Sequence, residues 1–581
     1  MEFLKKYIAR YKFRIILMVI LTILVAIFTL ITPIIFSYLI DNILQGDISK
    51  GLFKLLSQNE ALWIGAIIVV VINLLLALFY YLRGKNNAQL GEHIVADIRN
   101  DLYRHIQKLP YDFFVKSDSG ELIQKCTNDV DMIGRIFSNQ LSEMVFCIMI
   151  AGCAMAYLFY LNVRLSLIAF ISIPIIFIFA IYFFTKMQQH FLASDNADGK
   201  LVSKLQEAIN GVRVVKAFNN EKYEIAQFDQ RNQEYRDITF ELIRLLGVYY
   251  SFSDLLVYSQ IVLVVLFGIY AVLDHSITIG DLLVFITYET NILYPIRQLG
   301  RIIADIGKVS VSAKRLKGIM DEPVEDLVAG EAHDITNEIA FNHVSFAYDN
   351  GIEVLHDLNF SIHQGETIAI MGATGSGKSS LVHLLIRLYD CTQGQILIDD
   401  IDIKNINRQQ LRKQIGIVLQ EPFLYSKSIY DNIKSVDVSE DTMYESCKIA
   451  CIHDVILSFK EGYQTLVGEK GVTLSGGQKQ RLAIARTLAH PFKVIIFDDS
   501  LSAVDTKTDS DIQNQLRQLT NITKIIVCQR VSSAMMADKI IMLDKGRIVE
   551  MGTSQELLQK QGLYAKIYAL QNKNVGGDVS V

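Results

Sequence analysis

Five stretches of the sequence run for about 20 residues without a single Asp, Glu, Lys or Arg, and all five lie before residue 320. A helix of roughly 20 apolar residues is long enough to cross the hydrocarbon core of a bilayer. The chain has 581 residues, 51% of them hydrophobic, so it can supply such helices and still build a second, ordinary domain. We therefore expect a membrane protein. The five runs are 15–40, 61–82, 144–163, 165–185 and 255–273.

The distribution of Lys and Arg predicts how these spans are oriented. Basic residues are frequent before the first run and in the long segments 83–142 and 186–244, whereas the other connections hold few. The positive-inside rule then puts the N-terminus and both long segments in the cytoplasm. Both segments are rich in helix formers, so we expect the spans to continue as helices beyond the membrane.

A sixth span is required if the C-terminal half is also cytoplasmic, because the number of crossings must then be even. The only candidate is 279–303, which hydropathy alone rejects. Such a helix must turn its charged residues toward protein or water. Those residues are Asp281, Glu289, Arg297 and Arg301.

The N-terminus poses a separate question, because an apolar run near it can be a secretory signal. The first run has 26 residues, against about 7 to 15 for the apolar core of a signal peptide, so we interpret it as a retained span. Residues 1–14 mix aromatic and basic side chains, which favours a helix at the membrane surface over a frayed, solvated terminus.

Residues 321–581 have a different character from residues 1–320. Short apolar strands alternate with helical stretches and glycines, the pattern of an α/β domain. Net charge is −5 and no basic field is present, so we expect no nucleic-acid partner. The seven cysteines form no CxxC pair, which suits a reducing compartment and makes a zinc site improbable.

Residues 321–581 contain a phosphate-binding loop. "TIAIMGATGSGKSSLVHLL" passes from an apolar strand through glycines into a helix, as GxxxxGK[ST] requires. Backbone N–H groups converge on phosphate oxygens, Lys378 adds a charge and the Ser379 hydroxyl can ligate Mg²⁺. This loop alone predicts that a nucleoside triphosphate binds together with Mg²⁺. The candidate binding residues are Gly372, Ala373, Thr374, Gly375, Ser376, Gly377, Lys378, Ser379 and Ser380.

Two further motifs indicate which class of nucleotide-binding protein the chain resembles. "KVIIFDD" is a buried-strand pattern that ends in Asp498, a candidate Mg²⁺ ligand, and "LSGGQKQR" at 474–481 precedes it. A P-loop with LSGGQ ahead of the acidic strand end resembles the ATP-binding cassette transporters, and the resemblance covers essentially the whole chain. It implies six membrane helices followed by an α/β P-loop nucleotide-binding domain, a membrane all-α domain at 1–320 and a cassette at 321–581.

The resemblance assigns further residues by position. It implies that Tyr348 stacks on adenine, although a tyrosine of the strand core is the alternative, and that Gln420 contacts Mg²⁺. It also implies that the D-loop 502–505 and the segment 465–471 lie at subunit contacts. The signature residues, which in this family cover ATP bound to the opposite subunit, are Ser475, Gly476, Gly477 and Gln478.

The first half resembles the exporter branch, in which six spans precede one nucleotide-binding domain. "LPYDFFVKSDSGELIQKCTNDVDMI" and "AINGVRVVKAFNNEKYEIAQF" are similar to the two intracellular coupling regions of that branch. Either segment alone could be a solvated helical hairpin. The implied location is the cell membrane, with the nucleotide-binding domain in the cytoplasm.

Two positions depart from the family pattern. Asp499 stands where the family has the glutamate that polarises the attacking water, and Gln529 stands where it has a histidine that contacts the γ-phosphate. Asp499 is shorter by one methylene, and a misplacement of about 1 Å can cost about a hundredfold in rate. Gln529 can donate a hydrogen bond but cannot carry a proton or charge. We therefore expect slow hydrolysis at this chain's own P-loop.

An intact signature beside an impaired P-loop site predicts a heterodimer with a second half-transporter that supplies the missing glutamate and histidine. The alternatives are a homodimeric lipid or drug flippase, an ATP-binding regulatory subunit, or an importer on the exporter fold. The expected cargo is a hydrophobic drug, a lipid or a similar amphiphile. Glu289 is a candidate contact for a cation, and a water-facing carboxylate or one paired with Arg297 is the alternative.

Overall fold

The computed structural model describes residues 2–41, 58–349, 351–434, 438–468, 474–500 and 504–575. The chain forms two compact units, each described here by itself. The first comprises Met1–Lys108 and Ser117–Glu322, and the second comprises Leu109–Lys116 and Pro323–Val581. A short segment from the first half of the sequence therefore belongs to the second unit.

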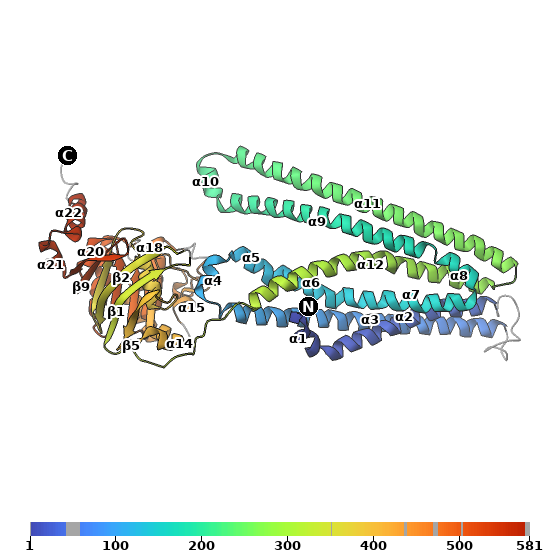
Figure 1. The fold of residues 1–581 in the computed structure, drawn as a ribbon, viewed down its shortest axis with the longest axis horizontal. Helices are drawn as coiled ribbons and strands as arrows, with labels where there is room; N and C mark the ends of the chain where they lie inside the picture. Colours follow the sequence, from blue (N-terminus) through green and yellow to red (C-terminus); the bar gives the residue numbers. More distant parts are fainter. Residues whose placement is uncertain are drawn as a thin grey trace. The chain divides into compact units, whose positions relative to one another are not determined.

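The first unit consists of long helices (Figure 1). Among the described residues, five helical stretches are long and apolar enough to cross a membrane. The sixth expected span is one continuous helix, α12, of 42 residues, so its charged residues do not break it. The helices are α1 (Glu2–Arg10), α2 (Lys12–Leu39), α3 (Gln58–Ile106), α5 (Ser119–Gln124), α6 (Val130–Arg135), α7 (Leu141–Leu161), α8 (Val163–Ala169), α9 (Ser172–Asn210), α10 (Val212–Ala217), α11 (Glu221–Leu273) and α12 (Ile279–Met320), with π-helical turns η2 (Lys125–Asp129) and η3 (Ile136–Gln140).

Buried polar contacts fix several of these helices against one another. The hydroxyls of Thr22 on α2 and Ser142 on α7 lie 3.0 Å apart. The Tyr288 hydroxyl on α12 donates to the Leu30 carbonyl at 2.6 Å. These bonds satisfy the hydroxyls of Thr22, Ser142 and Tyr288, which have no water to bind inside an apolar bundle.

The N-terminal helix α1 packs on the part of α3 that extends beyond its apolar run. Leu4 and Tyr7 are buried, Lys6 pairs with Asp101 at 2.7 Å, and the Tyr11 hydroxyl donates to Asp97 at 2.7 Å. The terminus is folded, so the alternative of a frayed end is wrong.

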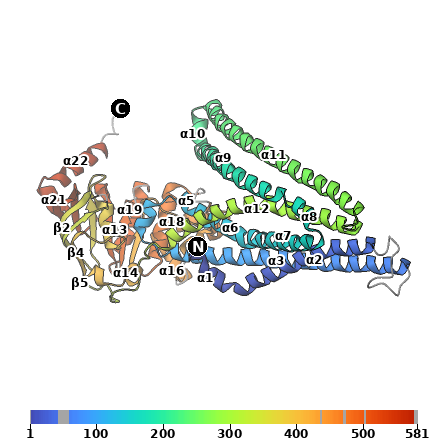
Figure 2. The same ribbon diagram turned by 45° about the vertical axis from the view of Figure 1, so that its right-hand side comes forward.

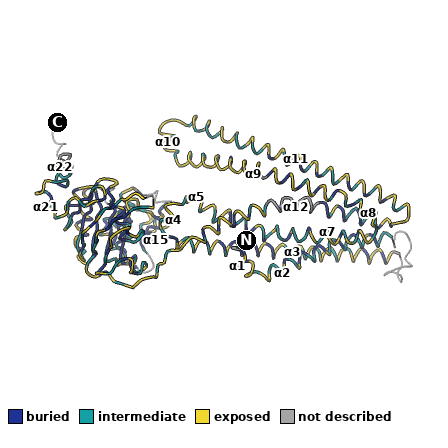
Figure 3. Tube along the Cα trace, viewed as in Figure 1, coloured by how far each residue is buried: buried dark blue, intermediate teal, exposed yellow. Residues whose placement is uncertain are grey.

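The helices α9 and α11 form a long hairpin closed by the short helix α10. They run side by side in both views (Figures 1 and 2), held by ion pairs such as Lys204 with Glu224 at 2.9 Å. Both helices extend far past their apolar runs, as expected for the second long segment. The outer faces of the hairpin are exposed (Figure 3).

The second unit contains two sheets with helices around them. One is antiparallel, in the order β2-β1-β4-β5, and the other is a six-stranded sheet in the order β10-β9-β3-β8-β7-β6. In the larger sheet β9, β3, β8, β7 and β6 are parallel, and β10 is antiparallel at the edge. The strands are β1 (Glu338–Ala347), β2 (Glu353–His363), β3 (Thr367–Met371), β4 (Gln393–Ile398), β5 (Ile401–Asp402), β6 (Ile415–Val418), β7 (Val494–Asp498), β8 (Thr523–Cys528), β9 (Lys539–Asp544) and β10 (Arg547–Gly552).

Apolar strands explain why the parallel sheet is the core of this unit. All five residues of β7 and all six of β8 are buried, the pattern of strands covered on both faces. The surrounding helices are α4 (Tyr111–Lys116), α13 (Lys378–Leu385), α14 (Arg408–Gln414), α15 (Ile429–Ile433), α16 (Glu440–Ile449), α17 (His453–Leu457), α18 (Gly476–Leu488), α19 (Thr506–Arg517), α20 (Val531–Ala534), α21 (Ser554–Gln559) and α22 (Leu563–Val575), with 3₁₀ turns η4 (Ile403–Asn405) and η5 (Gly462–Gln464).

The sheet topology brings the sequence motifs together. Strands β3, β8, β7 and β6 are parallel neighbours, and each is followed at its carboxyl end by a candidate site residue. Those carboxyl ends meet at one edge of a parallel sheet, where open α/β folds bind ligands.

Candidate functional site

The P-loop is a tight turn between β3 and α13 that only glycine permits at several points. Gly375 and Gly377 have φ values of 83° and 101°, which L-residues rarely adopt. A Cβ atom on Gly372 would lie 2.2 Å from the Leu543 carbonyl oxygen. Larger side chains at these positions would force the loop backbone away from its phosphate-binding path.

Two features of the loop fit a bound triphosphate. The Ser376 hydroxyl is buried and has no hydrogen-bond partner among the described residues. Lys378 is buried, and its ammonium donates to the carbonyls of Gly372 at 2.9 Å and Ala373 at 2.8 Å. Burial lowers the Lys378 pKa, and the charges of Asp499 and Asp498 oppose that shift. A phosphate would supply the anionic partner that this buried ammonium requires.

The acidic pair occupies the end of β7, next to the P-loop lysine. Burial raises the pKa of Asp498, the adjacent charge of Asp499 raises it further, and Lys378 and a hydrogen bond from Ser379 oppose the increase. Burial also raises the pKa of Asp499. A bound cation would oppose this effect of burial on both carboxyl groups, and Asp498 with Ser379 offers the hard oxygen ligands that Mg²⁺ prefers.

Asp499 itself lies in a strained backbone turn. Its φ is 45°, and its N–H donates to the Val527 carbonyl on β8 at 2.9 Å. The Gln420 amide, which follows β6, donates to a carboxylate oxygen of Asp499 at 3.5 Å. The structure therefore gathers Ser379, Gln420, Asp498 and Asp499 around one point.

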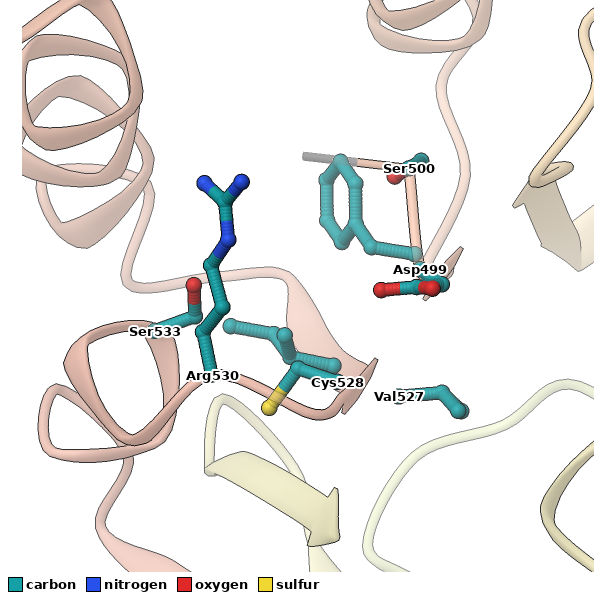
Figure 4. Close-up of a pocket in the computed structure, with 8 residues that line it drawn as sticks. Asp499, Ser500, Val527, Cys528, Arg530 and Ser533 are labelled. Atoms are coloured by element: carbon teal, nitrogen blue, oxygen red, sulfur yellow. The ribbon is translucent and has the colours of Figure 1, made fainter. Parts of the chain in front are cut away.

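The loop after β8 contributes a residue that the sequence did not single out. A recess beside Asp499 is lined by residues of β7, β8 and α20 and by Arg530 (Figure 4). Gln529 is not among the lining residues, and its side chain is exposed. Arg530 lies across the recess from Asp499, and its charge acts to lower the pKa of that carboxyl.

Tyr348 packs within an aromatic cluster rather than projecting freely. Its ring makes edge contacts with Phe346 at 4.8 Å and Tyr389 at 5.4 Å, and its hydroxyl lies 2.9 Å from the Ser380 oxygen. The half-buried ring remains next to the P-loop helix, where an adenine-stacking residue is needed.

The same cluster receives helix α4 from the first half of the sequence. The Tyr111 ring lies 5.6 Å from His383 and 5.9 Å from Tyr389, and Lys116 pairs with Asp349, the neighbour of Tyr348. The first expected coupling segment therefore contacts this unit next to the adenine-stacking candidate.

The signature residues form the N-terminus of α18. The Ser475 hydroxyl accepts from the Gln478 N–H at 3.3 Å, and the Gln478 side chain accepts from the Ser475 N–H at 2.9 Å. This capping box satisfies two otherwise free N–H groups. None of the residues lining the recess beside Asp499 comes from the signature. Ser502, Ala503 and residues 469–471, which belong to the predicted contact loops, lie outside the described residues.

Glu289 lies inside the first unit rather than on an open cavity. It is 3% exposed, and neither carboxyl oxygen has a hydrogen-bond partner in the described part of the chain. Its surroundings are apolar, with Leu158, Phe170 and Ile292 nearby. The expectation of a water-facing carboxylate is therefore wrong for this conformation. The Arg297 side chain lies outside the described residues, so that pairing stays a hypothesis.

Comparison with known families agrees with this arrangement. The ABC transporter transmembrane region matches residues 15–296, and the ABC transporter domain matches residues 355–502. The chain belongs to the ABC transporter family. With one transmembrane region and one ABC domain, it is a half-transporter of the exporter type.

Several relatives of this ABC transporter span almost its whole length. It is 35% identical to an ATP-dependent lipid A-core flippase of Syntrophus aciditrophicus over 499 residues, 84% of this chain and 83% of that protein. It is 33% identical to a candidate multidrug export ATP-binding/permease protein of Staphylococcus aureus over 577 residues, 98% of this chain and 99% of that protein. A bacterial Atm1-family ABC exporter with ATP bound superposes with a TM-score of 0.83 at 26% identity, covering 97% of this chain and 99% of that one.

Some site contacts of this ABC transporter carry no motif in the sequence. Gln480, buried in α18, donates to the Gln420 carbonyl at 3.2 Å and so ties the signature helix to the loop that carries Gln420. Its place in "LSGGQKQR" is the only signal for it. Arg530 and the Lys116–Asp349 pair take their places through tertiary contacts. Sequence reasoning missed these two contacts and that of Gln480.

Proposed function

We propose that this chain is the degenerate-site subunit of a heterodimeric exporter that uses ATP to move hydrophobic drugs, lipids or similar amphiphiles across the cell membrane. The observation that carries the proposal is the combination of Asp499 and Gln529 at the chain's own P-loop with an unaltered Ser475–Gln478 signature. A homodimer of this chain would contain two weak sites, whereas a partner with the usual glutamate and histidine would complete one competent site against this signature.

Each site residue has a role in this proposal. Lys378 and the backbone of residues 372–380 hold the phosphates, and Tyr348 orients the adenine. Bound Mg²⁺ would neutralise phosphate charge, held by Ser379, Asp498 and Gln420. Asp499 reaches less far than glutamate toward a water aligned with the γ-phosphate, so this site retains ATP through many cycles of the partner site.

The tip of the α9–α11 hairpin supports the need for a second subunit. Val214 is 61% exposed and Phe218 is 78% exposed, within and directly after the short helix α10 at the end of the hairpin (Figure 1). Neighbouring apolar side chains left in water mark a protein-binding surface. We assign it to the nucleotide-binding unit of the partner half-transporter, as the second coupling region.

The names of the relatives support the cargo class. One is named as a lipid A-core flippase and another as a candidate multidrug export protein, and both lipids and drugs are amphiphiles. The distribution of basic residues supports a cytoplasmic N-terminus. We place the nucleotide-binding unit in the cytoplasm as well, because it binds ATP.

The test compares ATP hydrolysis by three purified preparations in lipid nanodiscs: this chain alone, the half-transporter that co-purifies with it from native membranes, and the pair. We expect near-background phosphate release from this chain alone and rapid release from the pair. High turnover by this chain as a homodimer would falsify the proposal and favour the homodimeric flippase.

A further inference from the structure

The side chain of Gln571 binds the backbone on both sides of Arg530. Its amide nitrogen donates to the Gln529 carbonyl at 2.9 Å, and its amide oxygen accepts from the Val531 N–H at 2.8 Å. A primary amide carries a donor and an acceptor side by side, so one glutamine can satisfy both groups at once.

These two backbone groups lie where one element ends and the next begins. The last residue of β8 that pairs with β3 is Cys528, and α20 starts at Val531. The first N–H groups of a helix have no acceptor within that helix. Gln571 therefore provides contacts that neither the sheet nor α20 offers to the loop 529–531.

Helix α22, which carries Gln571, is fixed at its base by independent contacts. The Glu550 carboxylate on β10 accepts from the N–H groups of Leu563 and, at 3.1 Å, Tyr564. A carboxylate at a helix N-terminus is favourable both as an acceptor and as a charge. Tyr564 is fully buried, and its hydroxyl lies 2.8 Å from the Ser554 oxygen.

The core beneath α22 is continuous with the strand and helix around the loop. Tyr564 belongs to the same hydrophobic cluster as Cys528, Val531 and Ala534. The position of Gln571, about two turns beyond Tyr564, is therefore set by the packing of this cluster.

We infer that Gln571 is a positioning residue for the γ-phosphate sensor: it fixes the backbone that presents Gln529 and Arg530 to nucleotide bound at this chain's P-loop. The inference goes beyond the proposed function and rests on it only in assigning Gln529 to the γ-phosphate. Because the loop would read the third phosphate, Gln571 acts on the discrimination between triphosphate and diphosphate rather than on nucleotide affinity in general.

The first experiment measures amide hydrogen exchange in the purified full chain without nucleotide. Gln571→Met keeps the size of the side chain and removes both hydrogen bonds, and Gln559→Met on the exposed end of α21 is the matched control. We expect peptides containing Val531 to exchange about fivefold faster in Gln571→Met only, the effect of losing one typical hydrogen bond. Unchanged exchange at Val531 would overturn the assignment of Gln571 as the loop's anchor.

The second experiment compares the binding of β,γ-imido-ATP and ADP, each with Mg²⁺, to the same variants. We expect Gln571→Met to weaken the binding of the triphosphate analogue about fivefold and to change the affinity for ADP by less than twofold. Gln571→Glu should weaken it at least as much, since a carboxylate cannot donate to the Gln529 carbonyl. Equal weakening of both nucleotides would mean that Gln571 only stabilises the fold, and would overturn the inference.

This inference and the proposed function can fail independently of each other. Rapid ATP hydrolysis by the chain alone would refute the heterodimer proposal without changing the exchange result at Val531. Conversely, if Gln571→Met bound β,γ-imido-ATP and ADP with the same ratio of affinities as wild type, that result would refute the positioning role and leave the subunit assignment intact.

Discussion

The side-chain amide of Gln420 donates to the carboxylate of Asp499 across 3.5 Å, joining the loop after β6 to the residue after β7. A longer side chain at position 499 would extend past this contact toward the phosphates. We predict that Asp499→Glu combined with Gln529→His raises hydrolysis at this site by about a hundredfold. The measurement is phosphate release by heterodimers whose partner glutamate has been changed to glutamine, with Asp499→Asn as the control. A double variant no faster than wild type would show that another group limits turnover.

The Lys116–Asp349 pair should matter for coupling and not for folding. Both side chains are more than half exposed, and such pairs contribute little stability. We predict that Asp349→Asn leaves the unfolding temperature unchanged and reduces substrate stimulation of ATP hydrolysis by about a factor of two to five. Asp112→Asn is the matched control, because Asp112 pairs with Lys116 within α4 itself. Equal losses in both variants would argue against a role for the contact with Asp349.

The exposed hairpin tip yields a prediction about assembly. Phe218→Ser should leave the chain folded, since this ring is 78% exposed in the single chain, and should lower ATP hydrolysis by the heterodimer severalfold. Phe240→Ser, at a ring 66% exposed on α11 and about 28 Å from the start of that helix, is the control. Size-exclusion chromatography with mass measurement would show whether pairing or only turnover is affected.

Asp399 gives a pH-dependent prediction. Burial acts to raise the pKa of this carboxyl, but hydrogen bonds from the N–H groups of Glu338, Thr336 and Asn337 and from the Thr336 hydroxyl outweigh it and hold the pKa well below its usual value. A lowered folded-state pKa stabilises the fold above the unfolded pKa of about 3.9 and ceases to do so as the pH falls through the folded value.

We therefore expect Asp399→Asn to lose about 2 kcal/mol of unfolding free energy at pH 7. The difference in unfolding free energy between this variant and wild type should persist down to about pH 5 and disappear at lower pH. Asp400→Asn, at an exposed residue of the same turn, should behave as wild type throughout. Thermal unfolding of the purified chain followed between pH 7 and pH 3 measures both variants, and a gap independent of pH would contradict the assignment.

The buried position of Glu289 makes its neutral analogue informative. A charge buried without a partner costs several kcal/mol, so Glu289→Gln should unfold at the same or a higher temperature. We also predict reduced export of cationic dyes and unchanged export of neutral dyes, because only a cation gains from a carboxylate. Transport in membrane vesicles measures both dyes side by side, and equal export of the two by wild type and variant would remove the idea of a cation contact.

The sequence predicted the parts of this protein that have local patterns. The P-loop, the buried strand before Asp498 and the two-domain order follow from glycine spacing and apolar runs, and the structure has them. Helix α12 was predicted only through the need for an even number of spans, because its charges hide it from hydropathy.

Contacts between distant segments were beyond such reasoning. Lys116 and Asp349 are 233 residues apart, and Gln571 lies 42 residues after Gln529. Nothing local in the sequence marks a lysine or glutamine as the partner of a remote residue, since either is usually a solvated side chain. The burial of Glu289 likewise depends on how four helices pack, which periodicity does not specify.

Helix α4 is synthesised more than two hundred residues before Tyr389, which its Tyr111 ring contacts. Until Tyr389 has been made, Tyr111 lacks this contact, so the aromatic cluster beside Tyr348 stays incomplete. A chain truncated before Tyr389 would leave the Tyr111 ring without this contact. The packing of this early segment in the second unit therefore depends on residues that the ribosome adds much later.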